Sequence, residues 1–237
     1  MRSAPPRCGR RIDLLLGPLC KHRFRTQGAA QLVCPKVGYR PVMTRWLAVT
    51  IAATPGLLLA VLGLFHPAQL TPASAQAWWQ LHVVLLPVFP LLGGVLVFLV
   101  RGEPGACAWL ARAAAYVFAT FYTGLDTLAG IGAGLAVATQ PGGSPVALDL
   151  IVVGDHLGLV GVTGYLLAAL TTALVLLRRD GIAAAPGAVL LVGAAVVFLH
   201  SHIFWPVGGL AMLAVGIGCG LLAWHGRVIR PRSRVTS

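Results

Sequence analysis

The amino-acid sequence predicts an all-α fold: a polytopic integral membrane bundle of six transmembrane helices with both termini in the cytoplasm. Of its 237 residues, 57% are hydrophobic and only 10% are charged, whereas about a quarter of the residues in a soluble domain are charged. Lys and Arg are confined to short segments between long apolar runs. This composition excludes a water-soluble globule. The formal charge is +12, and the basic residues that produce it are distributed as in a membrane protein rather than as in a nucleic-acid-binding protein.

Six stretches are long enough to cross a bilayer, because about 20 apolar residues of helix span a hydrocarbon core about 30 Å thick. The predicted spans are residues 46–66, 80–100, 108–138, 150–177, 183–202 and 206–226. Arg112, near the start of the third span, is the one Lys or Arg inside them. The third and fourth spans exceed a straight crossing, and tilt or an overhanging end absorbs the excess.

The orientation follows from the 18 basic residues. Ten of them precede or open the first span, and the other eight lie at 101–112, 178–179 and 227–234. The connections 67–79, 139–149 and 203–205 contain none, which places both termini in the cytoplasm. Tryptophans are expected as interfacial anchors, with Trp46, Trp109 and Trp224 at the inner edge and Trp78, Trp79 and Trp205 at the outer edge.

The chain divides into a basic arm (1–42), the six-span domain (43–226) and a basic tail (227–237). The arm carries nine Lys and Arg residues and three of the five cysteines. Two interpretations remain open. Either the arm is a disordered cytoplasmic segment that, like the tail, contacts anionic lipid headgroups, or translation begins at Met43.

Five of the seven histidines fall at or near the outer ends of spans: His66, His82, His156, His200 and His202. Neutral imidazoles together with carboxylates suit zinc, copper or iron. These histidines are therefore candidate metal ligands, with haem as the other cofactor considered. Each of them also has a simpler interpretation as an interfacial residue.

Asp126 is the acidic residue placed deepest in a span. It lies 14 residues beyond Arg112, which is about 21 Å of helix, so it is expected about 9 Å below the outer boundary of the core. A charged aspartate facing lipid at that depth is costly, so Asp126 must face the bundle, be protonated or have a partner. Tyr122 and Thr123 share its helical face. The predicted polar site comprises Asp126, Tyr122, Thr123 and Asp155.

Two classes of function follow. One is a protein with an outward-opening His/Asp site, either a small-solute or proton-coupled transporter or a metal- or haem-binding membrane protein. The other is a membrane scaffold or assembly partner with no chemistry of its own. No nucleotide-binding loop, GxSxG or HExxH motif occurs, so no catalytic residue is predicted and an enzyme is not favoured. Only two of the 18 basic residues are Lys, a bias typical of a GC-rich bacterial genome. The expected location is the bacterial plasma membrane, with the bilayer as partner and no nucleic acid.

Overall fold

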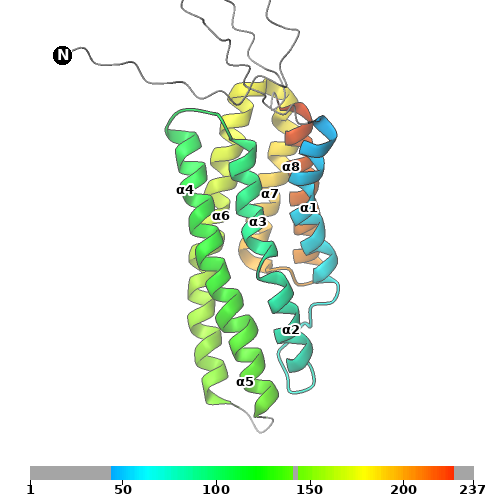
Figure 1. The fold of residues 1–237 in the computed structure, drawn as a ribbon, viewed down its shortest axis with the longest axis vertical. Coiled ribbons are helices and arrows are strands. Elements are labelled where there is room, and N and C mark those ends of the chain that lie inside the picture. The colour runs from blue at the N-terminus through cyan, green and yellow to red at the C-terminus, as the bar shows by residue number, and fades with distance from the viewer. Residues whose placement is uncertain (1–43, 141–143, 227–237) are drawn as a thin grey trace, which may run out of the picture. The chain divides into compact units, whose positions relative to one another are not determined.

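The computed structural model describes residues 44–140 and 144–226, and these residues are helical, with no strand among them. Predictions made for the basic arm and the basic tail fall outside the described residues. The elements in chain order (Figure 1) are α1 (Arg45–Gly63), α2 (Ala75–Leu85), α3 (Val88–Leu99), α4 (Ala106–Leu125), the π-helix η1 (Asp126–Gly132), α5 (Ala133–Thr139), α6 (Pro145–Asp180), the 3₁₀ turn η2 (Gly181–Ala184), α7 (Ala185–Ser201) and α8 (Val207–His225).

Five helical segments of the described chain are long and apolar enough to cross a membrane. They are Arg45–Gly63, Ala75–Leu99, Ala106–Thr139, Pro145–Ser201 and Val207–His225. The fourth contains two of the predicted spans, because α6, η2 and α7 follow one another without a loop. The all-helical fold is thus confirmed, and its apolar helices indicate a membrane-embedded protein that contacts lipid.

The helices differ in length, and this difference creates a step at one end of the bundle. α1, α7 and α8 have 19, 17 and 19 residues, or about 26–29 Å each. α6 has 36 residues, about 54 Å, and α4, η1 and α5 form another long continuous rod. Figure 1 shows α2, α5 and part of α6 continuing past the ends of α1, α7 and α8.

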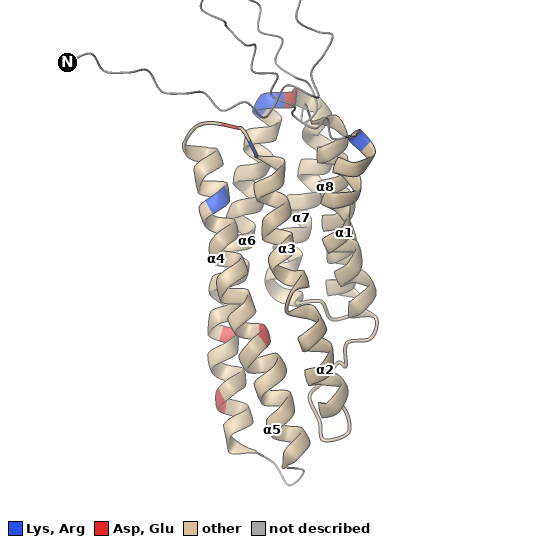
Figure 2. Ribbon diagram, viewed as in Figure 1, with Lys and Arg blue, Asp and Glu red and all other residues tan. Residues whose placement is uncertain are grey.

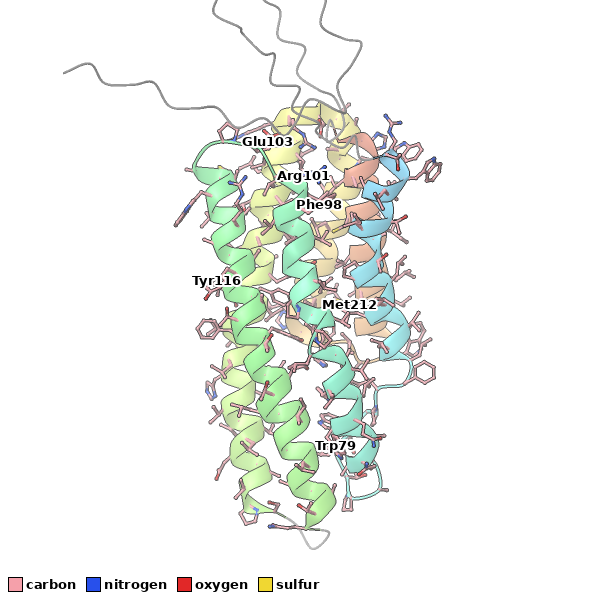
Figure 3. All side chains as sticks on the ribbon, viewed as in Figure 1. Trp79, Phe98, Arg101, Glu103, Tyr116 and Met212 are labelled. Atoms are coloured by element: carbon pink, nitrogen blue, oxygen red, sulfur yellow. The ribbon has the colours of Figure 1, made fainter. Side chains whose placement is uncertain are left out.

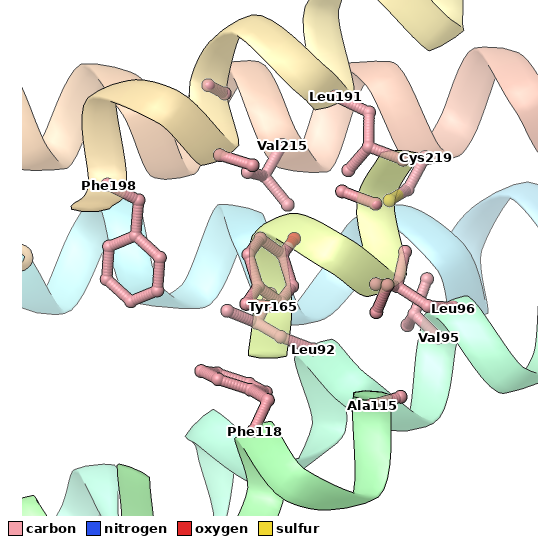
Figure 4. Close-up of a cluster of buried hydrophobic side chains, with 14 of the residues drawn as sticks. Leu92, Val95, Leu96, Ala115, Phe118, Tyr165, Leu191, Phe198, Val215 and Cys219 are labelled. Atoms are coloured by element: carbon pink, nitrogen blue, oxygen red, sulfur yellow. The ribbon is translucent and has the colours of Figure 1, made fainter. Parts of the chain in front are cut away.

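The sequence contains small-xxx-small pairs, among them Gly130 with Gly134 and Gly216 with Gly220, and such pairs predict close contact between helices. In the structure, small residues do bring some helices into backbone contact. Gly56 of α1 faces Gly216 of α8, and a Cβ added to Gly56 would lie 2.5 Å from the Gly216 nitrogen. Large side chains fill the core of the bundle, among them Phe118, Tyr165 and Phe198 (Figure 4). The second span is interrupted between α2 and α3, at Leu86–Pro87, because proline lacks the amide N–H that would continue the helix.

The basic residues of the described chain gather at one end of the bundle (Figure 2): Arg45, Arg101, Arg112, Arg178 and Arg179. Arg112 donates to the backbone oxygens of Val100 and Glu103, at 2.7 and 3.0 Å. Arg179 pairs with Asp180 at 2.7 Å and with Glu103 at 3.4 Å. These contacts fasten the α3–α4 connection to the end of α6. Figure 3 shows Arg101 and Glu103 at this end and Trp79 toward the opposite one.

Candidate metal centre

Three histidines from separate parts of the chain converge beside the step. His66 follows the end of α1, His82 lies in α2, and His202 directly follows α7. Each ring offers one nitrogen, and the three nitrogens lie within 4.8 Å of one another. His66 and His82 are 8% and 3% exposed. The three nitrogens are therefore close enough together to hold one metal ion.

Hydrogen bonds fix the tautomers of two of the rings. Nδ1 of His66 donates to the Pro67 carbonyl and Nδ1 of His82 donates to the Trp78 carbonyl, both at 2.8 Å. A carbonyl oxygen can only accept, so in each neutral ring the proton is on Nδ1 and Nε2 carries a lone pair. The two Nε2 atoms face each other at 3.5 Å. In a tetrahedral zinc site with Zn–N bonds of about 2.0–2.1 Å, two nitrogens lie about 3.4 Å apart. The pair is therefore already spaced to hold a cation.

His202 is held by a different device. Its backbone has φ 46°, which is an uncommon conformation for a residue with a Cβ and one that concentrates at functional sites. Its Nδ1 is hydrogen bonded to the hydroxyl of Tyr122, a buried residue of α4. Tyr122 therefore orients the third ring, as outer-shell partners orient metal-ligating histidines.

His66 and His202 lie in connections outside the helices, and both are neutral at pH 7. Burial lowers the pKa of His66 to about 4, and although the Pro67 carbonyl opposes this shift, the neighbouring His82 adds to it. Burial, followed by His66 and His82, lowers the pKa of His202 well below its usual value. The neutral imidazole is the form that binds a metal ion.

Asp126 lies next to the three rings. Its Oδ1 is 3.9 Å from Nε2 of His82, and the residue is fully buried. Neither carboxylate oxygen has a hydrogen-bond partner among the described residues. A buried, unpaired carboxylate is costly, by several kcal/mol on the order-of-magnitude scale for single ions, and a nearby cation removes that cost.

Local backbone geometry makes room for this cluster. Asp126 opens the π-helix η1, a rare form that often occurs at functional sites. Trp78 Nε1 donates to the Ala129 carbonyl in η1 at 3.1 Å, which ties α2 to this segment. Gly130 of η1 faces the ring of His82, where an added Cβ would lie 2.2 Å from Cδ2. Only glycine leaves the ring in its place.

A cavity of about 610 Å³ adjoins the cluster, and His82 and His202 are part of its wall. Its polar lining also includes Tyr122, Asp155 and His200. The remaining wall is largely apolar, formed by side chains such as Leu70, Leu125, Ile151, Leu159, Val162 and Leu199. The cavity thus reaches two of the three rings, those of His82 and His202.

The structure brings some of the sequence-predicted site residues together and separates others. Those gathered at the cluster are His66, His82, His202, Asp126 and Tyr122.

Asp155 and His200 line the cavity but are exposed. His156 is exposed on α6, where its Nδ1 donates to the Val152 carbonyl at 2.7 Å, and it is not part of the cluster. The Thr123 hydroxyl donates to the Ala119 carbonyl of its own helix at 2.6 Å.

Trp78 is a site residue that the sequence alone did not indicate. Expected as an interfacial anchor, it lies edge-on to His66 with ring centroids 4.9 Å apart and bonds to Ala129. Trp78 lies four residues before His82, so both side chains share one helical face. This spacing is the sequence feature that could have indicated its place beside the histidines.

Comparison of the chain with models of protein families, with curated proteins and with solved structures finds no match in any of the three. Function is therefore inferred from the fold and the site alone.

Proposed function

We propose that this chain is a membrane protein that binds one divalent transition-metal ion, zinc or copper, between His66, His82 and His202. The observation that carries the proposal is the pair of Nε2 lone pairs facing each other at 3.5 Å while both Nδ1 protons are held by carbonyls. Carbonyl-bound Nδ1 is the usual outer-shell arrangement of a ligating histidine. Without a cation, the two acceptors repel each other.

A bare ion suits this space better than haem. The rings of His66 and His82 are inclined at 78°, with Nε2 atoms 3.5 Å apart. Axial histidines of a haem lie on opposite sides of a flat macrocycle that is many ångströms wide. His202 and Asp126 occupy the positions beside the pair that such a plane would need.

Metal binding is also better supported than transport of a solute or ion through the bundle. The core between the site and the basic end is filled by aromatic and aliphatic side chains, among them Phe118, Tyr165 and Leu96 (Figure 4). Ring centroids of Phe118 lie 5.2 Å from Tyr122 and 4.8 Å from Tyr165. A scaffold without chemistry would have no need for an unpaired carboxyl group beside three buried or half-buried imidazoles.

The topology that we propose has six spans and cytoplasmic termini. The chain turns at η2, and α6 and α7 pack against each other, which supports counting them as separate spans. The described arginines lie at the end that includes this turn, and such a bias marks the cytoplasmic side. The histidine cluster then lies at the outer ends of α1 and α7, on the outer face of a bacterial plasma membrane.

Metal analysis of purified protein tests the proposal. Protein purified in detergent with an affinity tag free of histidine would be stripped with EDTA, reloaded with Zn²⁺, desalted and measured by plasma mass spectrometry. We expect one equivalent in the wild type and loss of it in His66→Ala, His82→Ala and His202→Ala. His156→Ala, which changes a histidine outside the cluster, is the matched control. Absence of retained zinc, or an equal loss in the control, contradicts the proposal.

A further inference from the structure

The three-histidine centre leaves a coordination position on the side of the cavity. Zinc takes four ligands, and sites that accept an exogenous ligand offer three from the protein and leave the fourth open. His82 and His202 belong to the cavity wall, so a molecule in the cavity can reach an ion held by them. The ligand atoms that all lie within 4.8 Å of one another are those of the three histidines, and the group does not include Asp126, whose Oδ1 lies 3.9 Å from His82 Nε2. Asp126 is therefore beside the ligand set rather than part of it.

Asp126 adds a second requirement for whatever occupies that position. A cation held by the three histidines favours the ionised form of Asp126. That form accepts hydrogen bonds and cannot donate them, and both oxygens of Asp126 lack a partner among the described residues. A buried acceptor without a donor is unfavourable. A head group that places an N–H or O–H next to its metal-binding oxygen satisfies the ion and the carboxylate together.

The cavity itself fits an apolar chain. Its volume of about 610 Å³ lies within the range of about 300–1,000 Å³ that is typical of small-molecule sites. Ile151, Leu159 and Leu199 form part of its wall. Leu159 is 59% exposed on α6, so apolar side-chain surface continues from the cavity wall to the outside of the bundle.

From these three features, and on the basis of the metal site proposed above, we infer that the cavity binds an amphiphile. Its head group would give an oxygen to the metal and an adjacent N–H or O–H to Asp126, and its apolar chain would lie against the walls provided by α6 and α7. Lipids with amide or hydroxyl head groups belong to this chemical class.

Cobalt-substituted protein makes the inference measurable, because the visible spectrum of Co²⁺ responds to its ligands. The probe is dodecanohydroxamic acid, which has an oxygen donor, an N–H and a twelve-carbon chain. Acetohydroxamic acid lacks the chain, and dodecanoate keeps the chain but lacks the N–H. In micelles of one fixed detergent, we expect dodecanohydroxamic acid to bind at least tenfold more tightly than either comparison compound. If cobalt binds but its spectrum is unchanged by the probe, the inference is overturned while the metal site stands. If cobalt itself fails to bind, the metal site is refuted as well.

Two variants test the roles of the wall and of the carboxylate. Leu159→Trp places a larger side chain on the cavity wall and should weaken the probe at least tenfold. Leu167→Trp, on the same helix, 41% exposed and outside the cavity lining, should have no effect. Asp126→Leu should retain cobalt and bind dodecanohydroxamic acid no better than dodecanoate. Loss of cobalt in Asp126→Leu would mean that Asp126 is a metal ligand and that no coordination position is open. Equal binding of the probe by the two tryptophan variants would mean that its twelve-carbon chain lies outside the cavity. Either result overturns the inference.

Discussion

Replacing Gly130 by alanine should displace the ring of His82 and disable the metal centre without unfolding the bundle. The added Cβ would lie 2.2, 2.4 and 2.8 Å from Cδ2, Cγ and Cβ of His82. All three atoms belong to the root and inner edge of the side chain, so no flexible tip can move aside. Reaching ordinary van der Waals contact requires a shift of roughly 1 Å, whereas metal–ligand distances tolerate only about 0.2 Å.

The structure also indicates how much zinc affinity and how much stability the substitution should cost. Changes to groups that merely orient a ligand cost about 10–100-fold in metal affinity, so moving the ligand itself should cost at least about 100-fold. Overpacking costs about 1–3 kcal/mol, and replacing a helical glycine by alanine returns about 0.5–1 kcal/mol. The net loss of stability should therefore be about 2 kcal/mol or less.

The matched control is Gly94→Ala, a helical glycine of α3 with no atom within 4 Å of an added Cβ. Zinc affinity would be measured by competition with a chromophoric chelator, and thermal unfolding by intrinsic tryptophan fluorescence. We expect wild-type affinity in Gly94→Ala and weak or absent binding in Gly130→Ala, with both proteins folded. Wild-type zinc affinity in Gly130→Ala would refute the reasoning, because it would mean that the position of His82 does not matter for the metal.

Three further predictions concern the site and the topology. Tyr122→Phe removes the hydroxyl that holds His202 and should lower zinc affinity about tenfold with little change in thermal stability; unchanged affinity would argue against an orienting role. In the metal-free protein, the pKa of His66 is about 4 in the folded state and 6.5 in the unfolded state. Between about pH 4 and pH 6.5 the unfolded chain therefore binds more protons than the folded one, and the free energy of unfolding falls as the pH is lowered. Thermal unfolding in EDTA should thus occur at lower temperature at pH 5 than at pH 7.5, and His66→Asn should reduce this difference; an equal difference in the variant would contradict the assignment. Reporter fusions at Thr71 should report an outside location, and fusions at Gly105 and Gly181 should report an inside location. An outside signal at Gly181 would contradict the proposed cytoplasmic turn between the fourth and fifth spans.

The sequence was sufficient for the fold class because long apolar runs have few alternatives in a membrane. Backbone amides and carbonyls must be satisfied within each crossing segment, which leaves the helix as the structure of a continuous apolar run. The break before Pro87 follows equally from local chemistry. The predicted break between the fourth and fifth spans falls at residues 178–182. There the structure has the 3₁₀ turn η2 rather than a loop, so it contains five continuous apolar segments where six spans were predicted.

The candidate site could be predicted only in part. The sequence placed five histidines on one side, but selecting three of them depends on how the chain continues after α1 and α7. His202 enters the cluster because α7 ends at Ser201 and the backbone then takes a positive φ, which no periodicity indicates. Thr123 shares the expected helical face with Asp126, yet its hydroxyl bonds to its own backbone, a common alternative for threonine in helices.

The role of Gly130 was likewise only half visible. Its place in a small-xxx-small pair indicated close approach to something, and a second helix was the natural expectation. The structure shows that the neighbour is the ring of a candidate ligand, His82. The group that Gly130 faces depends on how α2 and η1 are aligned along each other. This alignment is set by tertiary packing and cannot be read from the local sequence.

X-ray absorption spectroscopy of the zinc-loaded protein tests the proposed centre most directly, because it reports the atoms bound to the ion. His66, His82 and His202 as ligands predict three imidazole nitrogens at about 2.0–2.1 Å, with the outer-shell scattering characteristic of imidazole rings and one further light atom from solvent. Their individual alanine variants should each lose about a third of the imidazole signal or lose the metal. A first shell that contains sulfur, or one made of oxygens without imidazole scattering, would contradict the assignment of the three histidines as the metal-binding site.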